Sequence, residues 1–177
     1  MRLRFIEIIK TDYMIKKYYP SILLFFATVL LLSLGSCDPA KKYEKAETEA
    51  IANYLNSHVA DTFIKEQSGL YYRDVLVGTG STPIAHDTVD IVYTGKFLDG
   101  SQFTTNVGGA DLVFPVAEGL AIAGIDEGIT YMKVGGKATF LIPSALGYGP
   151  TGYGIISGYT PLLYDIQLVK VIPGPGK

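Results

Sequence analysis

The chain has 177 residues, of which 48% are apolar and 18% carry charge, a composition typical of globular proteins. This length predicts one folded domain with an extension. The single cysteine excludes a disulfide framework within the chain. With only two histidines besides, the chain has too few ligands for a structural zinc site made of Cys and His. We therefore expect neither a metal nor a cofactor.

The N-terminal segment predicts export. Lys16 and Lys17 precede an apolar run over residues 22–34, which is short for a membrane-spanning helix but fits the core of a signal peptide. Small residues follow the run directly before Cys37, a pattern that resembles the bacterial lipobox. That resemblance implies that signal peptidase II removes residues 1–36 and that Cys37 is then lipidated.

Other outcomes for this segment stay open. The alternatives are a cut by ordinary signal peptidase and an uncleaved anchor. Met14 is a second candidate start, because the residues that follow it make a better basic region than those before it. A lipid anchor would hold the protein on a membrane of the cell envelope, facing the periplasm or the cell surface.

The mature chain is predicted to be acidic. Residues 1–36 contain five of the 15 basic side chains and two of the 17 acidic ones, so 10 basic and 15 acidic side chains remain, a net charge of −5. Its one small basic cluster consists of Lys41, Lys42 and Lys45. This charge balance disfavours binding to nucleic acid.

Residues 37–67 predict a tether and a short helix. Residues 38–46 are polar and charged, as in a spacer, whereas residues 47–57 are predicted to be helical because apolar side chains gather along one side. These side chains are Ala50, Ile51, Tyr54 and Leu55. We expect this helix to extend the spacer and to pack partly on the domain.

Residues 68–171 predict an α+β domain, followed by a tail over residues 172–177. Strands are predicted over residues 70–75, 87–97, 101–103, 138–142 and 162–171. Asp99-Gly100 is a turn signal that joins the second and third strands as a hairpin. A helix is predicted over residues 119–132 because apolar residues recur there at spacings of three, four and three. These residues are Ile122, Ile125, Ile129 and Met132.

The segment from Ala138 to Tyr164 contains no Asp, Glu, Lys, Arg or His. It holds four tyrosines, five glycines and three prolines, and residues 143–161 within it are predicted to form a long loop. Long loops inside compact domains are usually functional. An aromatic and uncharged segment suits a pocket that works by shape and low dielectric, and it suits proton transfer or metal binding poorly.

Three other motifs are interpreted as structural. His86-Asp87 lies in a polar turn and the chain has no Gly-x-Ser-x-Gly elbow, which disfavours a hydrolase triad. Asp126-Glu127 lies on the predicted helix away from the isoleucines, so solvated charges are favoured over a catalytic carboxylate pair. Gly78-Thr79-Gly80 precedes no predicted helix, so it is interpreted as a turn and not as a phosphate loop.

Six strings follow one another in a distinctive order. They are Val92 to Gly95, Leu98 to Phe103, Ile122 to Gly128, Val134 to Ala138, Pro143 to Gly149 with Ile155-Ile156, and Leu162 to Val169. Together they resemble the FKBP-type peptidyl-prolyl isomerases over residues 68–171. The resemblance implies an antiparallel half-barrel sheet wrapped around one short helix, with an apolar pocket for proline between them.

The resemblance also implies a set of site residues. The catalytic residues would be Tyr93, Phe103, Tyr148 and Tyr164. The substrate-binding residues would be Thr104, Leu112, Phe114, Ala121, Ile122, Ile125 and Ile156. Ile125 would form the floor, while the Ile122 N–H and the Tyr148 hydroxyl would each bind a substrate carbonyl. For Phe114, Ile122 and Ile125, plain core packing is the alternative.

The candidate site differs from the family's common pattern at several positions. Thr104 stands where aspartate is usual, Leu112 where an aromatic residue is frequent, and Tyr164 where phenylalanine is frequent. The Thr104 hydroxyl can still accept a hydrogen bond from Tyr93, and the Tyr164 hydroxyl needs a partner if it is buried. The loop carries Ser157-Gly158 where many relatives have two prolines.

Two functions follow from these observations. The resemblance implies a lipid-anchored peptidyl-prolyl cis-trans isomerase that acts on proline-containing polypeptides and needs no cofactor. The alternative is a membrane-anchored peptide-binding or chaperone module with weak or no isomerase activity, and Thr104 and Tyr164 are the residues that divide the two. Because no heptad pattern or apolar patch argues for dimerisation, a monomer is expected.

Overall fold

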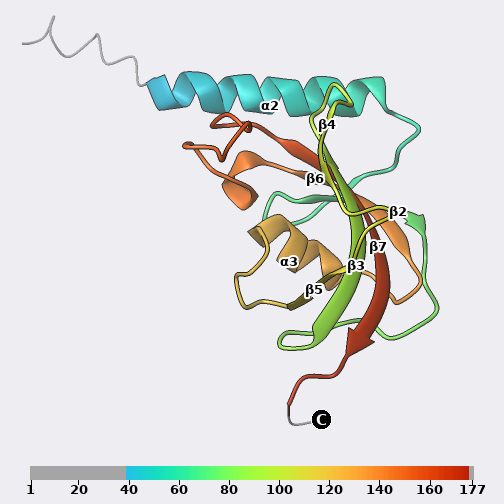
Figure 1. The fold of residues 1–177 in the computed structure, drawn as a ribbon. Helices are drawn as coiled ribbons and strands as arrows, with labels where there is room; N and C mark the ends of the chain where they lie inside the picture. The colour runs from blue at the N-terminus through green and yellow to red at the C-terminus, as the bar shows by residue number, and fades with distance from the viewer. Residues whose placement is uncertain (1–38, 176–177) are drawn as a thin grey trace, which may run out of the picture. The chain divides into compact units, whose positions relative to one another are not determined.

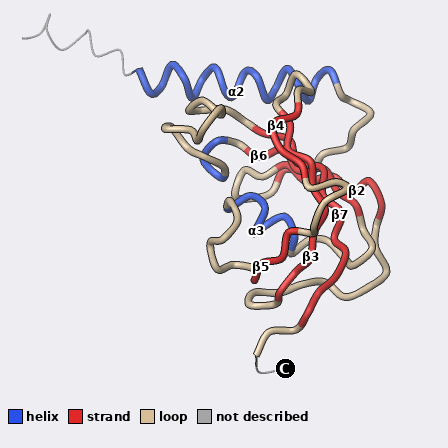
Figure 2. The backbone as a smooth tube through the Cα atoms, in the orientation of Figure 1, coloured by secondary structure: helices blue, strands red, loops and turns tan. Residues whose placement is uncertain are grey.

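The computed structural model describes residues 39–175, which form a seven-stranded antiparallel sheet and two α-helices (Figures 1 and 2). The elements are α2 (Pro39–Ser57), β1 (Ile64–Lys65), β2 (Tyr71–Leu76), β3 (Thr88–Lys96), β4 (Gln102–Thr105), β5 (Leu112–Pro115), α3 (Ala123–Ile129), β6 (Lys137–Ile142), the 3₁₀ turn η1 (Ser144–Leu146) and β7 (Leu162–Ile172). The strand order is β1-β2-β6-β7-β3-β4, and β5 also pairs with β3. The predicted α+β class is confirmed.

The main core lies between α3 and one face of the sheet. Strands β3 and β7 present every second residue to it, since successive side chains of a strand point to opposite faces. The residues of these two strands that are buried in this core are Val89, Ile91, Leu162, Tyr164, Ile166 and Leu168. The predicted alternation of both strands is therefore confirmed.

Two glycines allow α3 to approach β6 closely. A Cβ added to Gly124 would lie 2.5 Å from the Ile142 side chain, and one added to Gly128 would lie 2.5 Å from the Phe140 ring. Both distances are far below a van der Waals contact. The absence of side chains at these positions sets how near the helix lies to the sheet.

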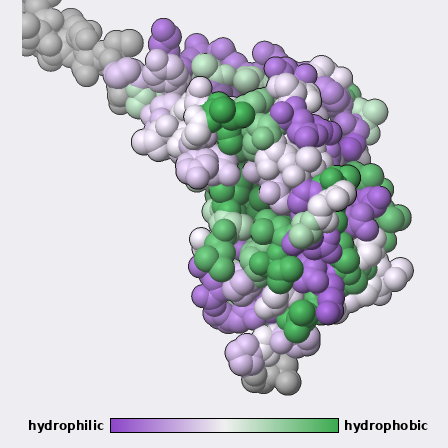
Figure 3. Space-filling model, in the orientation of Figure 1, coloured by the Kyte–Doolittle hydropathy of each residue, from purple (hydrophilic) through white to green (hydrophobic). Residues whose placement is uncertain are grey.

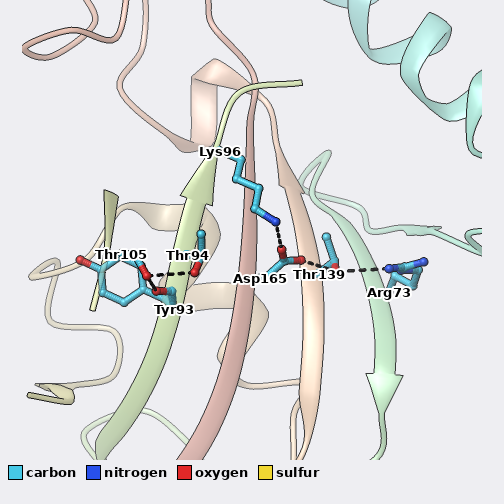
Figure 4. A network of polar contacts seen from close by, with 7 residues as sticks. All are labelled: Arg73, Tyr93, Thr94, Lys96, Thr105, Thr139 and Asp165. Carbon is cyan, nitrogen blue, oxygen red and sulfur yellow. Dashed lines mark hydrogen bonds and ion pairs between the residues drawn. The ribbon is translucent and has the colours of Figure 1, made fainter. Parts of the chain in front are cut away.

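A polar network covers the opposite face of the sheet (Figure 4). The Lys96 ammonium donates to Asp165 at 2.8 Å, and the Thr139 hydroxyl donates to the other carboxylate oxygen of Asp165 at 2.8 Å. Arg73 donates to Thr139 at 3.5 Å and forms an ion pair with Asp61. These contacts link β3, β7, β6 and β2 in turn, so the charges of the central strands lie on the face away from the core.

Helix α2 is longer than predicted, because it begins at Pro39 and includes the residues expected to form a tether. Residues 39–49 are rich in Ala, Lys and Glu, which favour helix, and proline suits a first turn. The packed side of the helix includes Ile51, Tyr54 and Leu55 as expected, whereas Ala50 is exposed. Within residues 39–175 no helix has the length and hydropathy needed to cross a membrane.

Helix α3 is shorter than the predicted 119–132. Gly119 has a φ of +70°, and Ile122 is extended at φ −64° and ψ 148°, so the helix cannot begin before Ala123. After Ile129, the Met132 N–H donates to the Ile129 carbonyl at 3.1 Å in a 3₁₀-type turn. This turn keeps Met132 buried on the same side, which is why the apolar spacing resembles a longer helix.

The sequence-based analysis missed β1 and β5. Strand β1 has two residues, both exposed, and therefore no alternation to detect. Strand β5 has four residues, of which Leu112 and Val113 are exposed side by side, so only Phe114 signals a buried face. Short strands with little buried surface leave a weak pattern.

Replacement of Gly128 by alanine should destabilise the domain, although alanine normally favours helix. The new methyl group would overlap with the Phe140 ring, and we expect a loss of about 1–3 kcal/mol in the free energy of unfolding. Urea denaturation measures this change. Gly109→Ala is the control, because its Cβ would meet nothing nearer than the Asn106 carbonyl oxygen at 3.4 Å. Equal stability of the two variants would contradict the close approach.

Candidate functional site

Three aromatic side chains from three strands meet at one end of the core. Tyr93 comes from β3, Phe103 from β4 and Tyr164 from β7. The ring centroids of Tyr93 and Tyr164 lie 6.0 Å apart, and those of Phe103 and Tyr164 lie 5.8 Å apart at 81°, an edge-to-face arrangement. Tyr164 is 3% exposed, whereas Tyr93 and Phe103 are half-buried.

Gly95 makes this meeting possible. It lies opposite Tyr164 in the pairing of β3 with β7 and opposite Thr104 in the pairing of β3 with β4. A Cβ on Gly95 would lie 2.8 Å from the Phe103 ring and 2.7 Å from the Thr104 methyl group. The Phe103 ring therefore occupies the space that a side chain at Gly95 would fill.

The loop over residues 143–161, here called the flap, supplies the next part of the cluster. Its Tyr148 side chain packs against the core that holds Tyr164 and helps to raise the pKa of the Tyr164 hydroxyl. The Tyr148 ring stacks on Tyr153 with centroids 5.5 Å apart. Tyr153 and Ile156 exchange backbone hydrogen bonds of 2.8 and 2.9 Å, which close the tip of the flap and bury Ile156.

The residues before and within α3 complete the core beside this cluster. Ile125 and Phe114 are 5% and 4% exposed, and Ala121 and Ile122 pack against the same core. The Ile122 carbonyl accepts the N–H groups of Ile125 and Asp126 at 2.9 and 3.1 Å. Among residues 39–175 no partner is found for the Ile122 N–H itself, so this donor remains available.

Nine of the eleven predicted site residues are thus part of one packed cluster. They are Tyr93, Phe103, Phe114, Ala121, Ile122, Ile125, Tyr148, Ile156 and Tyr164. Leu112 shares the face of Phe114 by alternation but is 38% exposed at the end of β5, outside the packed core. Hydrophobic side chains are exposed on this side of the molecule over α3 and β5 (Figure 3).

The Thr104 hydroxyl was considered able to accept a hydrogen bond from Tyr93. No such bond occurs within the described part of the chain. The next threonine makes the contact instead, because the Thr105 hydroxyl donates to the Tyr93 carbonyl at 3.0 Å (Figure 4). Thr104 faces the opposite side of β4 from Thr105, and its methyl group packs near Gly95.

Phe97 belongs to the aromatic cluster but was not predicted. Its ring centroid lies 5.0 Å from that of Phe103. The alternation that places Ile91 and Tyr93 inward continues through Gly95 to Phe97, so the strand pattern contained this information.

The charged motifs considered in the sequence lie outside the aromatic cluster. Some of them form hydrogen bonds that hold the neighbouring backbone or side chains. His86 lies 2.5 Å from the Glu118 carboxylate, and both side chains are exposed. Asp126 accepts the Ala117 N–H at 3.2 Å, so this carboxylate is bonded to the chain and not merely solvated. Glu127 likewise accepts hydrogen bonds from the hydroxyls of Ser68 and Tyr131. Within residues 39–175 no three His, Cys, Asp or Glu side chains are placed to hold a metal ion.

Tyr164 is held as a neutral phenol. Burial, with smaller effects from Tyr148 and Tyr93, raises the pKa of Tyr164 well above its ordinary value of 10.0. The polar side chains that act on this hydroxyl are Tyr148 and Tyr93. The cluster therefore offers an apolar surface, neutral hydroxyls and one free backbone donor. Such a site can orient a planar, uncharged group.

Comparisons with known proteins agree with this geometry. The sequence pattern described as FKBP-type peptidyl-prolyl cis-trans isomerase matches residues 80–169. The isomerase FkpA of Aeromonas hydrophila is 36% identical over 135 residues, which are 76% of this chain and 48% of that protein. The chain spans about half the length of this relative and of a second one, a probable FkpA from Neisseria meningitidis.

Solved structures support the same conclusion. The Escherichia coli FkpA structure has a TM-score of 0.64 at 28% identity, covering 90% of this chain and 74% of that one. A peptidyl-prolyl isomerase from Pseudomonas syringae has a TM-score of 0.66 at 27% identity, covering 78% of this chain and all of that one. The expected sheet with its short packed helix is confirmed. This chain therefore belongs to the family of FKBP-type peptidyl-prolyl cis-trans isomerases.

Proposed function

We propose that the protein accelerates rotation about Xaa-Pro bonds by binding the proline ring between Tyr93, Phe103 and Tyr164. The observation that carries this proposal is the convergence of three aromatic rings and two neutral hydroxyls on an uncharged surface. The membership of the chain in an isomerase family agrees with it. The substrates would be proline-containing polypeptides that are unfolded or still folding.

The chemistry of this reaction fits an uncharged site. Rotation about a peptide bond has a barrier of about 18–20 kcal/mol, and an Xaa-Pro bond takes tens to hundreds of seconds to rotate unaided. The planar amide carries more charge separation than the twisted one, because resonance places positive character on nitrogen. An apolar surface therefore disfavours the planar state relative to the twisted state. This is binding of the transition state in preference to the ground state, and it needs no proton transfer.

Two donors would hold the peptide on either side of the proline. The Ile122 N–H faces no partner among the described residues and would bind one carbonyl. The Tyr148 hydroxyl would bind another, provided that the Tyr164 hydroxyl donates to Tyr148 and leaves the Tyr148 proton free. That direction of donation also strengthens Tyr148 as a donor, because chains of hydrogen bonds polarise one another.

The same hydroxyl pair supports the second candidate function, a peptide-binding or chaperone module with little catalysis. If Tyr148 donates to Tyr164, its proton is occupied and the substrate carbonyl loses this donor. Thr104 adds no charge at the position where relatives usually carry aspartate. The aromatic surface would still bind proline-containing segments in that case.

We further propose that the protein is anchored by lipid at Cys37 and faces the periplasm or the cell surface. Residues 1–38 lie outside the described part of the chain, so the support for this proposal is the sequence alone. It rests on the apolar run and on the small residues directly before the single cysteine. A monomer remains our expectation.

A protease-coupled assay on Xaa-Pro peptides tests the activity with residues 38–177. We expect Tyr148→Phe to lower kcat/KM about two- to tenfold, the effect of one hydrogen bond. Phe103→Ala removes a ring from the proposed proline surface and should lower kcat/KM about tenfold or more. Tyr153→Phe is the matched control, since this flap tyrosine is 72% exposed. No acceleration by the wild-type domain would sink the enzyme proposal, and equal rates for Tyr148→Phe and Tyr153→Phe would refute the role of Tyr148.

The pH dependence of the reaction separates this mechanism from acid–base catalysis. Because no proton is transferred, kcat/KM should stay constant between about pH 6 and 9. A bell-shaped profile within that range, measured with the same peptides, would contradict the mechanism.

The decrease in the free energy of unfolding at alkaline pH should depend on Tyr164. Its pKa is raised in the folded state, so its contribution to stability is complete below about pH 10 and is lost as the pH rises above that value. This loss amounts to at most about 1.4 kcal/mol per pH unit. Urea denaturation between pH 8 and 11 should therefore show a shallower decline for Tyr164→Phe than for the wild type. Parallel declines would mean that Tyr164 is not the titrating group.

The anchor is tested by metabolic labelling with radioactive palmitate in the bacterial host. Cys37→Ser should abolish the label and move the protein from the membrane to the soluble fraction. Label that persists in this variant would rule out lipidation at Cys37.

A further inference from the structure

Helix α2 contacts the flap through a carboxylate. Glu47 lies in the middle of α2, and its side chain reaches Ser144, 97 residues later in the chain. One carboxylate oxygen accepts the Ser144 N–H at 2.5 Å, and the other accepts the Ser144 hydroxyl at 2.7 Å. Ser144 is 5% exposed, so this bidentate contact is shielded from water. Hydrogen bonds to a charged acceptor are roughly twice as strong as neutral ones.

Ser144 is the residue on which the flap is built. It begins η1, and its carbonyl accepts the N–H groups of Gly147 and Gly149 at 2.9 and 2.8 Å. These two bonds enclose Tyr148, the residue between the glycines. The Gly149 carbonyl in turn accepts the Tyr159 N–H at 3.0 Å, which joins the far side of the flap to the near side. The position of Ser144 therefore determines the position of Tyr148.

A second contact joins α2 to the far side of the flap. Tyr43 lies one helical turn before Glu47, and its ring stacks on Tyr159 with centroids 5.5 Å apart and an angle of 13°. Tyr159 has a φ of +58°, a backbone conformation that residues other than glycine rarely adopt. The stacking helps to hold it there.

The contacts lie along one stripe of α2. Tyr43, Glu47, Ile51 and Leu55 recur every four residues and so share a side of the helix. Ile51 packs with Leu141 and Leu163 at the ends of β6 and β7, which fixes the helix on the sheet. The part of α2 that precedes Ile51 lies over the flap (Figure 1). The helix thus connects a rigid part of the sheet with the loop that carries Tyr148.

We propose that α2 is a strap that holds the flap in its binding-competent position, and that Glu47 is a positioning residue for Tyr148. This inference rests on the proposed isomerase function, because it assigns Tyr148 to the substrate. Loss of the strap leaves the flap competent for only part of the time. The apparent affinity for substrate then falls by the competent fraction, while a bound substrate holds the flap in place. The effect therefore falls on KM and not on kcat.

The test compares Glu47→Gln with Glu49→Gln in the full chain, purified in mild detergent. Both variants remove one carboxylate from the same helix, but the Glu49 side chain is 64% exposed and pairs with Lys45 on the helix surface. We expect Glu47→Gln to raise KM about three- to tenfold with kcat changed less than about twofold. Glu49→Gln should leave both constants unchanged. A merely structural role would lower kcat through a smaller folded fraction and leave KM unchanged, and that result would overturn the proposal.

Amide hydrogen exchange provides a readout that does not depend on activity. In Glu47→Gln the amides of Gly149 and Tyr159 should exchange at least about threefold faster, while the amides of β3 and β7 keep their wild-type rates. If the wild type proves inactive, the function proposal fails, and faster flap exchange alone would still support the strap. Unchanged flap exchange overturns the strap whatever the activity. Should Glu47→Gln also loosen the sheet, Tyr43→Ala repeats the test from a side chain that is 55% exposed and outside the core.

Discussion

The pairing of β7 with β3 on one side and β6 on the other is the constraint on which the rest of the structure depends. This strand is paired with a neighbour along nearly its whole length, so its register is fixed from both sides. Tyr164 is thereby placed between Gly95 and Phe140. A shift by one residue would turn the β7 side chains of the main core to the polar face. This register places the Tyr164 ring against Tyr93 and Phe103, and the candidate site depends on that placement.

The same alternation explains why the candidate site carries no charge. On β7 the side chains of the main core lie on one face, whereas Asp165 faces outward and accepts hydrogen bonds from Lys96 and Thr139. The domain keeps a polar network on one side of a single sheet and an apolar surface on the other. Pairs as exposed as Lys96 and Asp165 add little to stability individually. Their placement leaves the inner face with the low dielectric that a reaction without charged intermediates requires.

Much of this arrangement was predictable, because the alternation of apolar residues in strands and the glycines of turns are patterns that can be recognised locally in the sequence. The alternation of apolar residues along β3 and β7 identified the buried faces. The resemblance of six strings to one family predicted the nine site residues that lie in one packed cluster. The elements that were predicted wrongly also have local explanations. Strands β1 and β5 bury too few side chains to show a period, and the turn after Ile129 continues the spacing of α3 without continuing its helix. The tether before residue 47 is helical because Ala, Lys and Glu favour helix even where no core is contacted.

The sequence by itself determined the chemistry that this site can offer. An uncharged, tyrosine-rich segment without cysteine or histidine suits proton transfer and metal binding poorly, because side-chain type decides that property. Only the tertiary structure decided which groups meet. Tyr148 packs against the core that holds Tyr164, Phe103 occupies the space beside Gly95, and Glu47 binds Ser144, which lies 97 residues later in the chain. Contacts of this kind depend on distances between elements, and no local pattern along the chain encodes them.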